Sequence, residues 1–259
     1  VRNIMVRRGY YSHEMMVVLV TRSKRIPGAN IIIPQIKEAL PEVTSIIQNV
    51  NQDKTNVILG DVNHVLWGNK VIKDTLFDKT FAIGPNSFYQ VNPQTTEILY
   101  KLAADKAELT GNETVIDAYS GIGTISLTIA DKVKSVLGVE VVPGAVDDAK
   151  RNADLNNVHN VKFELGKAEE KMVAWQQDDL KPDVIFVDPP RKGLTTELID
   201  AASAMSPSKI VYISCNPATL VRDVAQFKEN GYKIKGDVQP VDQFPQTTHI
   251  ESVTVLERN

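Results

Sequence analysis

The feature that most constrains the fold is a regular alternation, from about residue 93 onward, between short apolar runs and segments of helical length. Such alternation is typical of a doubly wound, mostly parallel α/β sheet with helices on both faces. Ligands of these folds bind beyond the carboxyl ends of the strands, so residues that follow each strand are the first candidates for a site. The expected strands are 114–118, 135–140, 161–165, 184–187, 210–214, 234–241 and 251–256, and the expected helices are 95–107, 124–130, 144–156, 195–204 and 218–229.

The first third of the chain has a different pattern, in which helical periodicity appears once, between strand-like runs. The sequence therefore predicts two domains, a small α+β domain over residues 1–85 and a larger α/β domain over residues 86–259. Because the chain begins within a strand pattern, we expect further chain to precede it in the whole protein. In the small domain we expect strands at 4–6, 15–20, 57–59 and 81–83, a turn at 9–13 and a helix at 31–40.

The first strand of the larger domain runs into a turn that contains Gly121 and Gly123, which allow a ligand to approach the backbone closely. The next strand ends on Glu140, 23 residues after Asp117, and an acidic residue at about this separation can bind the hydroxyls of a ribose. A dinucleotide-binding turn, as in a dehydrogenase, needs a third glycine where this chain has Ser126. A cationic nucleoside without phosphates, such as S-adenosylmethionine, fits better. The alternative interpretation is a plain turn that begins a helix.

Two later strands end in residues suited to catalysis. Asp188 follows one strand and begins a turn that Pro189 and Pro190 make rigid. Enzymes that methylate exocyclic amines carry a similar turn ending in an aromatic residue, whereas Arg191 stands here. Cys215, the only cysteine, lies at a strand-to-helix junction, where helix N-terminal amides can stabilise a thiolate. A small buried core residue is the alternative interpretation of this cysteine.

Composition narrows the class of protein. One cysteine forms no internal disulfide and alone builds no zinc or iron–sulfur site. No run approaches the roughly 20 apolar residues of a membrane span, no signal peptide is recognised, and a cytoplasmic location is expected.

The net charge is −3, but residues 1–25 hold six basic residues and one acidic residue, a local balance of +5. This segment either meets phosphates or is a solvated strand edge.

Three segments carry a resemblance to a known family. The run from Asp188 to Gly193, followed by the run from Val211 to Thr219, resembles the first signature of the RNA uracil-C5 methyltransferases of the bacterial ribosomal and transfer RNA type. The segment 241–251 is similar to the second signature of that family, and Phe88-Tyr-Gln-Val-Asn92 is similar to the start of its catalytic domain.

The resemblance implies a Rossmann-like class I methyltransferase domain and specific residue roles. Cys215 is the implied nucleophile and Glu251 the implied general base, although Glu251 alone would read as an incidental surface carboxylate. Asp188 is implied to border both the cofactor and the uracil. The residues implied to line the S-adenosylmethionine site, with Gly121 from the glycine turn, are Gln90, Tyr119, Gly121, Thr124, Glu140 and Asp188.

The implied activity is transfer of a methyl group to C5 of a specific uracil in RNA, giving 5-methyluridine through a covalent Cys–C6 adduct. We expect 23S ribosomal RNA as substrate, with transfer RNA as the alternative and an exocyclic-amine methyltransferase or an RNA-binding module as more distant ones. Family members usually carry an N-terminal RNA-binding barrel and some carry a four-cysteine iron–sulfur cluster. Neither feature is found in this sequence, and one cysteine cannot hold such a cluster. We expect no metal, no membrane and no obligate protein partner.

Overall fold

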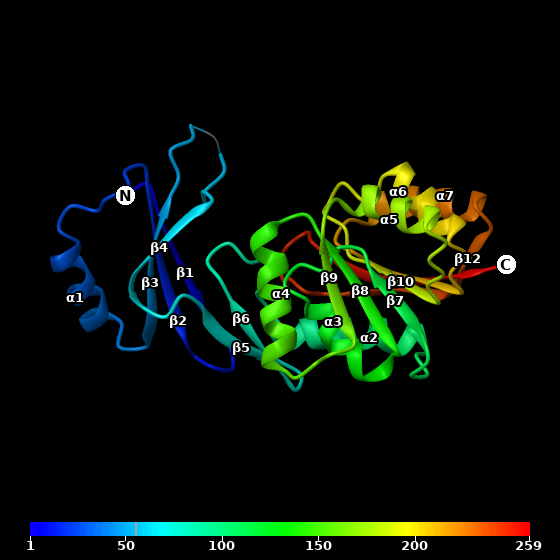
Figure 1. The fold of residues 1–259 in the computed structure, drawn as a ribbon, viewed down its shortest axis with the longest axis horizontal. Coiled ribbons are helices and arrows are strands. Elements are labelled where there is room, and N and C mark those ends of the chain that lie inside the picture. Colours follow the sequence, from blue (N-terminus) through cyan, green and yellow to red (C-terminus); the bar gives the residue numbers. More distant parts are fainter. Residues whose placement is uncertain (55) are drawn as a thin grey trace. The chain divides into compact units, whose positions relative to one another are not determined.

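The computed structural model describes residues 1–54 and 56–259, which divide into two compact units, Val1–Phe88 and Tyr89–Asn259 (Figure 1). The division falls three residues beyond the expected boundary at residue 85. The first unit is a small α+β structure, and the second holds the alternating strands and helices.

The second unit is built on a seven-stranded sheet in which five adjacent strands are parallel. The strand order is β12-β13-β11-β10-β7-β8-β9, and β13 runs antiparallel to both of its neighbours. The chain therefore reverses its direction of winding between β7 and β10, the arrangement that creates a ligand crevice at the carboxyl edge. The strands are β7 (Thr114–Asp117), β8 (Ser135–Glu140), β9 (Val161–Leu165), β10 (Val184–Val187), β11 (Lys209–Ser214), β12 (Tyr232–Val241) and β13 (Glu251–Arg258).

Helices cover this sheet, and polar side chains cap several of them. Asn92, Thr195 and Asn216 each accept a hydrogen bond from a backbone N–H in the first turn of the following helix. In Figure 1, α5, α6 and α7 lie together on one side of the strands, while α2 and α3 lie on the other. The helices are α2 (Pro93–Ala107), α3 (Thr124–Ile129), α4 (Pro143–Leu155), α5 (Ala168–Gln177), α6 (Thr196–Ala204) and α7 (Pro217–Glu229), with a 3-10 turn at Ala130–Lys132.

The core beneath α5, α6 and α7 is apolar and fully buried. Ile185 of β10 and Tyr212 of β11 contact side chains such as Leu198 and Phe227 from the helices above. Burial of each large apolar side chain contributes about 1.5–3 kcal/mol to folding. The packed strands therefore hold the loops at their carboxyl ends in fixed positions.

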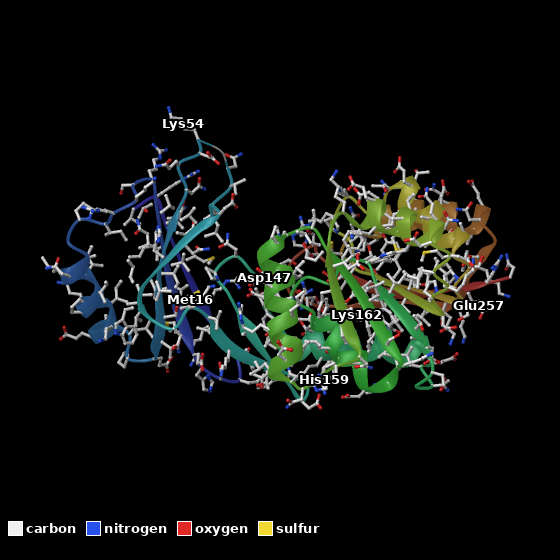
Figure 2. All side chains as sticks on the ribbon, in the orientation of Figure 1. Met16, Lys54, Asp147, His159, Lys162 and Glu257 are labelled. Atoms are coloured by element: carbon white, nitrogen blue, oxygen red, sulfur yellow. The ribbon has the colours of Figure 1, made fainter. Side chains whose placement is uncertain are left out.

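The first unit contains a four-stranded sheet, a helix and a hairpin. The sheet order is β1-β2-β3-β4, with β2 and β3 parallel and connected through α1, whose isoleucines pack on Val17, Leu19 and Ile46. Met16 points from β2 within this sheet (Figure 2) and is fully buried. The elements are β1 (Asn3–Arg8), β2 (Met15–Thr21), α1 (Ala29–Ala39), β3 (Val43–Val50), β4 (Val62–Gly68), β5 (Ile72–Leu76) and β6 (Lys79–Ile83).

Most expected elements are confirmed, but the prediction of a strand at 57–59 is wrong. That segment has no regular structure, and the Asn51 side chain donates hydrogen bonds to the carbonyls of Val57 and Ile58 at 2.8 and 3.0 Å. These contacts replace the ladder that a strand would need. The sequence analysis also missed β3, β4, β5 and α5.

A candidate active site at the carboxyl edge of the sheet

The register of β11 against β13 brings Cys215 beside Glu251, although 36 residues separate them in the sequence (251 minus 215). Ser214 at the end of β11 pairs with Ser252 of the antiparallel β13, so the next residue on one strand faces the previous residue on the other. Asp188 directly follows β10, which pairs with the other side of β11. Three residues from distant segments therefore meet at one edge of the sheet.

At this edge of the sheet, burial and neighbouring negative charges favour the protonated forms of the two carboxyl groups and the thiol. Burial raises the pKa of Glu251 to about 7, and Arg191 partly offsets the shift. Burial, then the negative charges of Glu251 and Asp117, raise the pKa of Asp188 to about 8. Burial also raises the pKa of the Cys215 thiol, with Glu251 and Asp188 adding to the effect and Arg191 opposing it. The two carboxyl groups thus change protonation near neutral pH, as catalytic acids and bases require, whereas the same surroundings oppose ionisation of the Cys215 thiol.

Arg191 is the cation of this cluster, and it is exposed. One nitrogen of its guanidinium lies 3.4 and 3.3 Å from the two ring nitrogens of His249. Near-equal distances to both nitrogens place the guanidinium over the ring face rather than in its plane. Phe244 packs edge-on against the same ring at a centroid distance of 6.5 Å.

The N-terminal part of α7 holds the Asp188–Gly193 turn. Asn216 donates to the Arg191 carbonyl at 3.0 Å, and Arg222 donates to the Lys192 carbonyl at 2.9 Å. Asp223, with no exposed surface, accepts hydrogen bonds from the Leu194 amide at 2.8 Å and the Tyr212 hydroxyl at 2.6 Å. The turn that carries Asp188 is therefore fixed to the helix that follows Cys215.

Gly193 completes this junction. Its φ of +74° favours glycine, and a Cβ there would lie 2.6 Å from a carboxylate oxygen of Asp223. Any larger residue would both strain the backbone and displace the carboxylate.

A second group of residues lies after β7 and β8. Gly121 donates its backbone N–H to Glu140 at 3.1 Å, and Val142 donates to the other Glu140 oxygen at 2.7 Å. Both carboxylate oxygens are thus oriented by the backbone, and each retains capacity to accept a further hydrogen bond. The space where a Cβ of Gly121 would lie is open.

Next to this loop lies a buried carboxylate with an unsatisfied oxygen. Asp117 accepts a hydrogen bond from Ser126 at 2.6 Å through one oxygen, while its other oxygen and the Ser120 hydroxyl are buried without partners. Burial raises the pKa of Asp117 to about 6. Buried polar atoms without partners are costly, so this pair marks a place where a polar ligand would be stabilised.

Tyr100 of α2 links the expected cofactor residues. Its hydroxyl lies 3.3 Å from the Thr124 hydroxyl and close enough to the Gln90 side chain to share a hydrogen bond. Burial and the charge of Asp188 raise the pKa of this phenol. Gln90, Thr124 and Asp188 are consequently grouped around one phenol.

These groups fit a cationic nucleoside. Glu140 suits two ribose hydroxyls, and the unpartnered oxygens of Asp117 and Ser120 suit hydrogen-bond donors or positive charge. A pyrophosphate is a poor match, because Asp117 would repel it and Ser126, which replaces the third glycine, is fully buried.

The side chain of Tyr119 has different surroundings from those of the other expected cofactor residues. Its ring packs against the core that contains Ala118 and Val139, and the charges that raise its pKa, after burial, are those of Glu169 and Asp223. It takes no part in the hydrogen bonds around Tyr100.

The sequence analysis missed Tyr100 and Asp223. A signal existed for Asp223, because it lies on the same face of its helix as Leu220, Val224 and Phe227, where a carboxylate demands a partner. Tyr100 gave no such signal, since an aromatic residue on an apolar helix face is ordinary.

In the part of the chain that the structure describes, no three His, Cys, Asp or Glu side chains are grouped to hold a metal ion. Within the same residues, no helix combines the length and apolarity that a membrane crossing requires.

Comparisons with known proteins show the family of this chain. The sequence model of the tRNA (Uracil-5-)-methyltransferase family matches residues 70–259. An RNA methyltransferase of Lactiplantibacillus plantarum, named as uncharacterized, is 65% identical over 258 residues, covering 100% of this chain and 56% of that protein. A protein of the same name from Enterococcus faecalis is 55% identical and covers 98% of this chain. The chain spans about half the length of the curated relatives it matches.

Among solved structures, the Pyrococcus abyssi tRNA (uracil-54, C5)-methyltransferase in complex with S-adenosyl-L-homocysteine has a TM-score of 0.78 and 32% identity. The match covers 98% of this chain and 59% of that one. The M. jannaschii tRNA m1G37 methyltransferase has a TM-score of 0.61 at 14% identity and so shares the fold alone. The second unit therefore has the Rossmann-like methyltransferase fold.

Proposed function

We propose that this chain, which belongs to the tRNA (uracil-5-)-methyltransferase family, holds the catalytic centre of an enzyme that methylates C5 of a uracil in RNA, with S-adenosylmethionine as methyl donor. The names of the relatives support RNA methylation, and the family supports uracil C5 as the target atom. The observation that carries the proposal is that Cys215 and Glu251 each adjoin the last pair of β11 and β13, Ser214 with Ser252, while Asp188 directly follows the adjoining strand β10.

This arrangement suits a carbon that is too weak a nucleophile to be methylated directly. The Cys215 sulfur forms a bond to C6 of the uracil, and the electron pair of the C5–C6 double bond moves toward C5 and O4. S-adenosylmethionine supplies the methyl group that C5 then accepts. Glu251 removes the C5 proton, the C5–C6 double bond re-forms, and the sulfur–C6 bond breaks to regenerate the thiolate. The balance is one methyl group gained by the uracil, one proton released, and S-adenosylhomocysteine left as a neutral thioether when the sulfonium–methyl bond breaks.

Each remaining group has a proposed task. Arg191, whose charge lowers the pKa of both Cys215 and Glu251, favours the thiolate and the carboxylate that the reaction needs. Asp188, when protonated, donates a hydrogen bond to the uracil edge. Gln90, Gly121, Thr124 and Glu140 hold S-adenosylmethionine, and the backbone of Tyr119 completes its site.

The uracil must leave its stack to reach Cys215, so the substrate is expected to be a loop or another unpaired region. We propose ribosomal RNA, as the sequence analysis expected. Transfer RNA is the second candidate, and it is favoured by the similar Pyrococcus abyssi enzyme, which is named for a tRNA uracil as its target.

The test is mass spectrometry of the protein incubated with 5-fluorouridine-containing RNA and S-adenosylmethionine. Fluorine at C5 leaves no proton for Glu251 to remove, so the enzyme is expected to stall as an adduct that carries the methyl group on the base and a bond to Cys215. Ribosomal and transfer RNA fragments are tested side by side. Methyl transfer to an exocyclic nitrogen without any adduct, in the whole-length protein, would overturn the proposal in favour of amine methylation.

A further inference from the structure

We propose that His249 is a positioning residue whose ring face holds the guanidinium of Arg191 beside Cys215 and Glu251; this role rests on the proposed function of those two residues. The proposed reaction needs a thiolate and a carboxylate at this edge of the sheet. Arg191 is the cation whose charge lowers the pKa of both groups. Because its side chain is long and exposed, the charge has this effect only while the side chain is kept close.

The contact between Arg191 and His249 has the geometry of a stack. One guanidinium nitrogen lies 3.4 Å from Nδ1 and 3.3 Å from Nε2 of the ring. A nitrogen in the ring plane at these distances would collide with the ring carbons, so it lies over the ring face. Arginine stacks on aromatic faces in this way. Among the residues that the structure describes, no carboxylate forms an ion pair with Arg191, so the stack is the contact that orients its charged end.

Both members of the stack are attached by short lengths of backbone to the proposed catalytic residues. The Arg191 carbonyl accepts a hydrogen bond at 3.0 Å from Asn216, the residue directly after Cys215. His249 comes shortly before Glu251, the first residue of β13. The stack therefore connects the turn after β10 to the loop before β13, next to the end of β11.

The loop that carries His249 is itself held in place. Gln243, only 1% exposed, donates to the Thr96 hydroxyl of α2 at 2.9 Å. Phe244 packs edge-on against the His249 ring, and the Thr247 hydroxyl accepts the His249 backbone N–H at 3.2 Å and donates to the Phe244 carbonyl at 2.7 Å. The alternative is an incidental surface histidine. The unbroken series of contacts from α2 to the guanidinium favours a positioning role.

The test uses the single cysteine of the chain, because alkylation by iodoacetamide then reports on Cys215 alone. The thiolate is the form that reacts, and the reagent is uncharged, so the pH profile of the rate gives the thiolate fraction. The charged groups that act on this thiol are Glu251, Asp188 and Arg191. His249→Ala is expected to lower the thiolate fraction at about pH 8 by about 2–5-fold. His249→Phe keeps a ring face and is expected to stay within about 1.5-fold of wild type.

Two further variants separate positioning from a structural defect. Arg191→Gln removes the cation and is expected to lower the thiolate fraction at least as much as His249→Ala does. In the Arg191→Gln background, His249→Ala is expected to have no further effect, because a residue that acts through Arg191 has nothing left to position. His159→Ala is the matched control, since His159 is exposed and lies shortly before β9, at the amino end of that strand (Figure 2). It is expected to match wild type.

An unchanged thiolate fraction in His249→Ala would overturn the proposal. So would an equal loss in the Arg191→Gln background, which would indicate a disturbed loop, and so would a loss in His249→Phe as large as that in His249→Ala. Alkylation is measured without RNA or S-adenosylmethionine. Failure to form the 5-fluorouridine adduct would therefore contradict the proposed function while leaving the link between His249, Arg191 and the thiol separately measured.

Discussion

At the scale of single residues, Cys215 has acidic neighbours that oppose its ionisation and one cation that favours it. Because the proposed adduct depends on this sulfur, Cys215→Ala is expected to reduce methyl transfer at least about 10³-fold. Affinity for S-adenosylhomocysteine, measured by calorimetry, is expected to change less than about twofold. Cys215→Ser is the conservative control and is expected to be equally inactive. Turnover near wild type in either variant would contradict the covalent mechanism.

Glu251 gives the reaction a pH dependence. Burial raises its pKa to about 7, and only the unprotonated carboxylate accepts a proton. The rate of transfer is therefore expected to fall about tenfold for each pH unit below 7. Glu251→Gln is expected to accumulate a protein–RNA adduct that survives denaturing electrophoresis. Intact transfer by this variant, with the same acidic limb in its pH profile, would remove Glu251 as the base.

The sequence alone predicted those site residues that directly follow a recognisable strand. Asp188 and Cys215 each follow an expected strand, and these two strands, β10 and β11, pair with each other. Glu251 needed the resemblance, because only strand pairing reveals that the start of β13 faces the end of β11. Tyr100 was not predictable, since its role arises from α2 packing near a loop that follows a different strand.

At the scale of elements, α7 connects the Cys215 junction to the Asp188 turn through Asp223. Asp223→Asn keeps the size but loses the charge that the Leu194 amide and the Tyr212 hydroxyl share. The free energy of unfolding is expected to fall by about 1–3 kcal/mol. KM for RNA is expected to rise more than that for the cofactor. Denaturant unfolding and steady-state kinetics measure the two effects.

Glu229→Gln makes the same chemical change at the exposed end of α7 and serves as the control. It is expected to alter stability by less than about 0.5 kcal/mol. Equal effects of the two substitutions would show that the buried hydrogen bonds of Asp223 contribute no more to stability than an exposed carboxylate does.

The elements of the second unit were more predictable than those of the first. Strands β8, β9 and β10 occur at the expected residues, β8 and β10 because they are mainly apolar runs and β9 because apolar and charged residues alternate along it. In β3, the buried Gln48 and Asn49 interrupt the apolar pattern and are satisfied by tertiary hydrogen bonds that the sequence does not display. The three apolar residues at 57–59 have strand composition but form no regular structure.

At the scale of the whole molecule, the two units are expected to respond separately to the cofactor. The residues proposed to hold it all lie in Tyr89–Asn259. S-adenosylhomocysteine at about 100 times its Kd stabilises the state that binds it by about 2.7 kcal/mol. Hydrogen exchange is therefore expected to slow around residues 117–124 and 138–142. Amides of residues 1–54 provide the internal control, and comparable slowing there would contradict separate responses.

The crowding of carboxyl groups at the sheet edge has a consequence for how the protein is stored. Asp117, Asp188 and Glu251 have pKa values of about 6, 8 and 7, all above those of an unfolded chain, so the folded state takes up protons as the pH falls from about 8. Their contribution to stability is present in full at pH about 4 and is lost as the pH rises through 6 to 8. Without ligand, the protein is thus expected to have a longer shelf life in mildly acidic buffer than in the alkaline buffer where its chemistry is fastest.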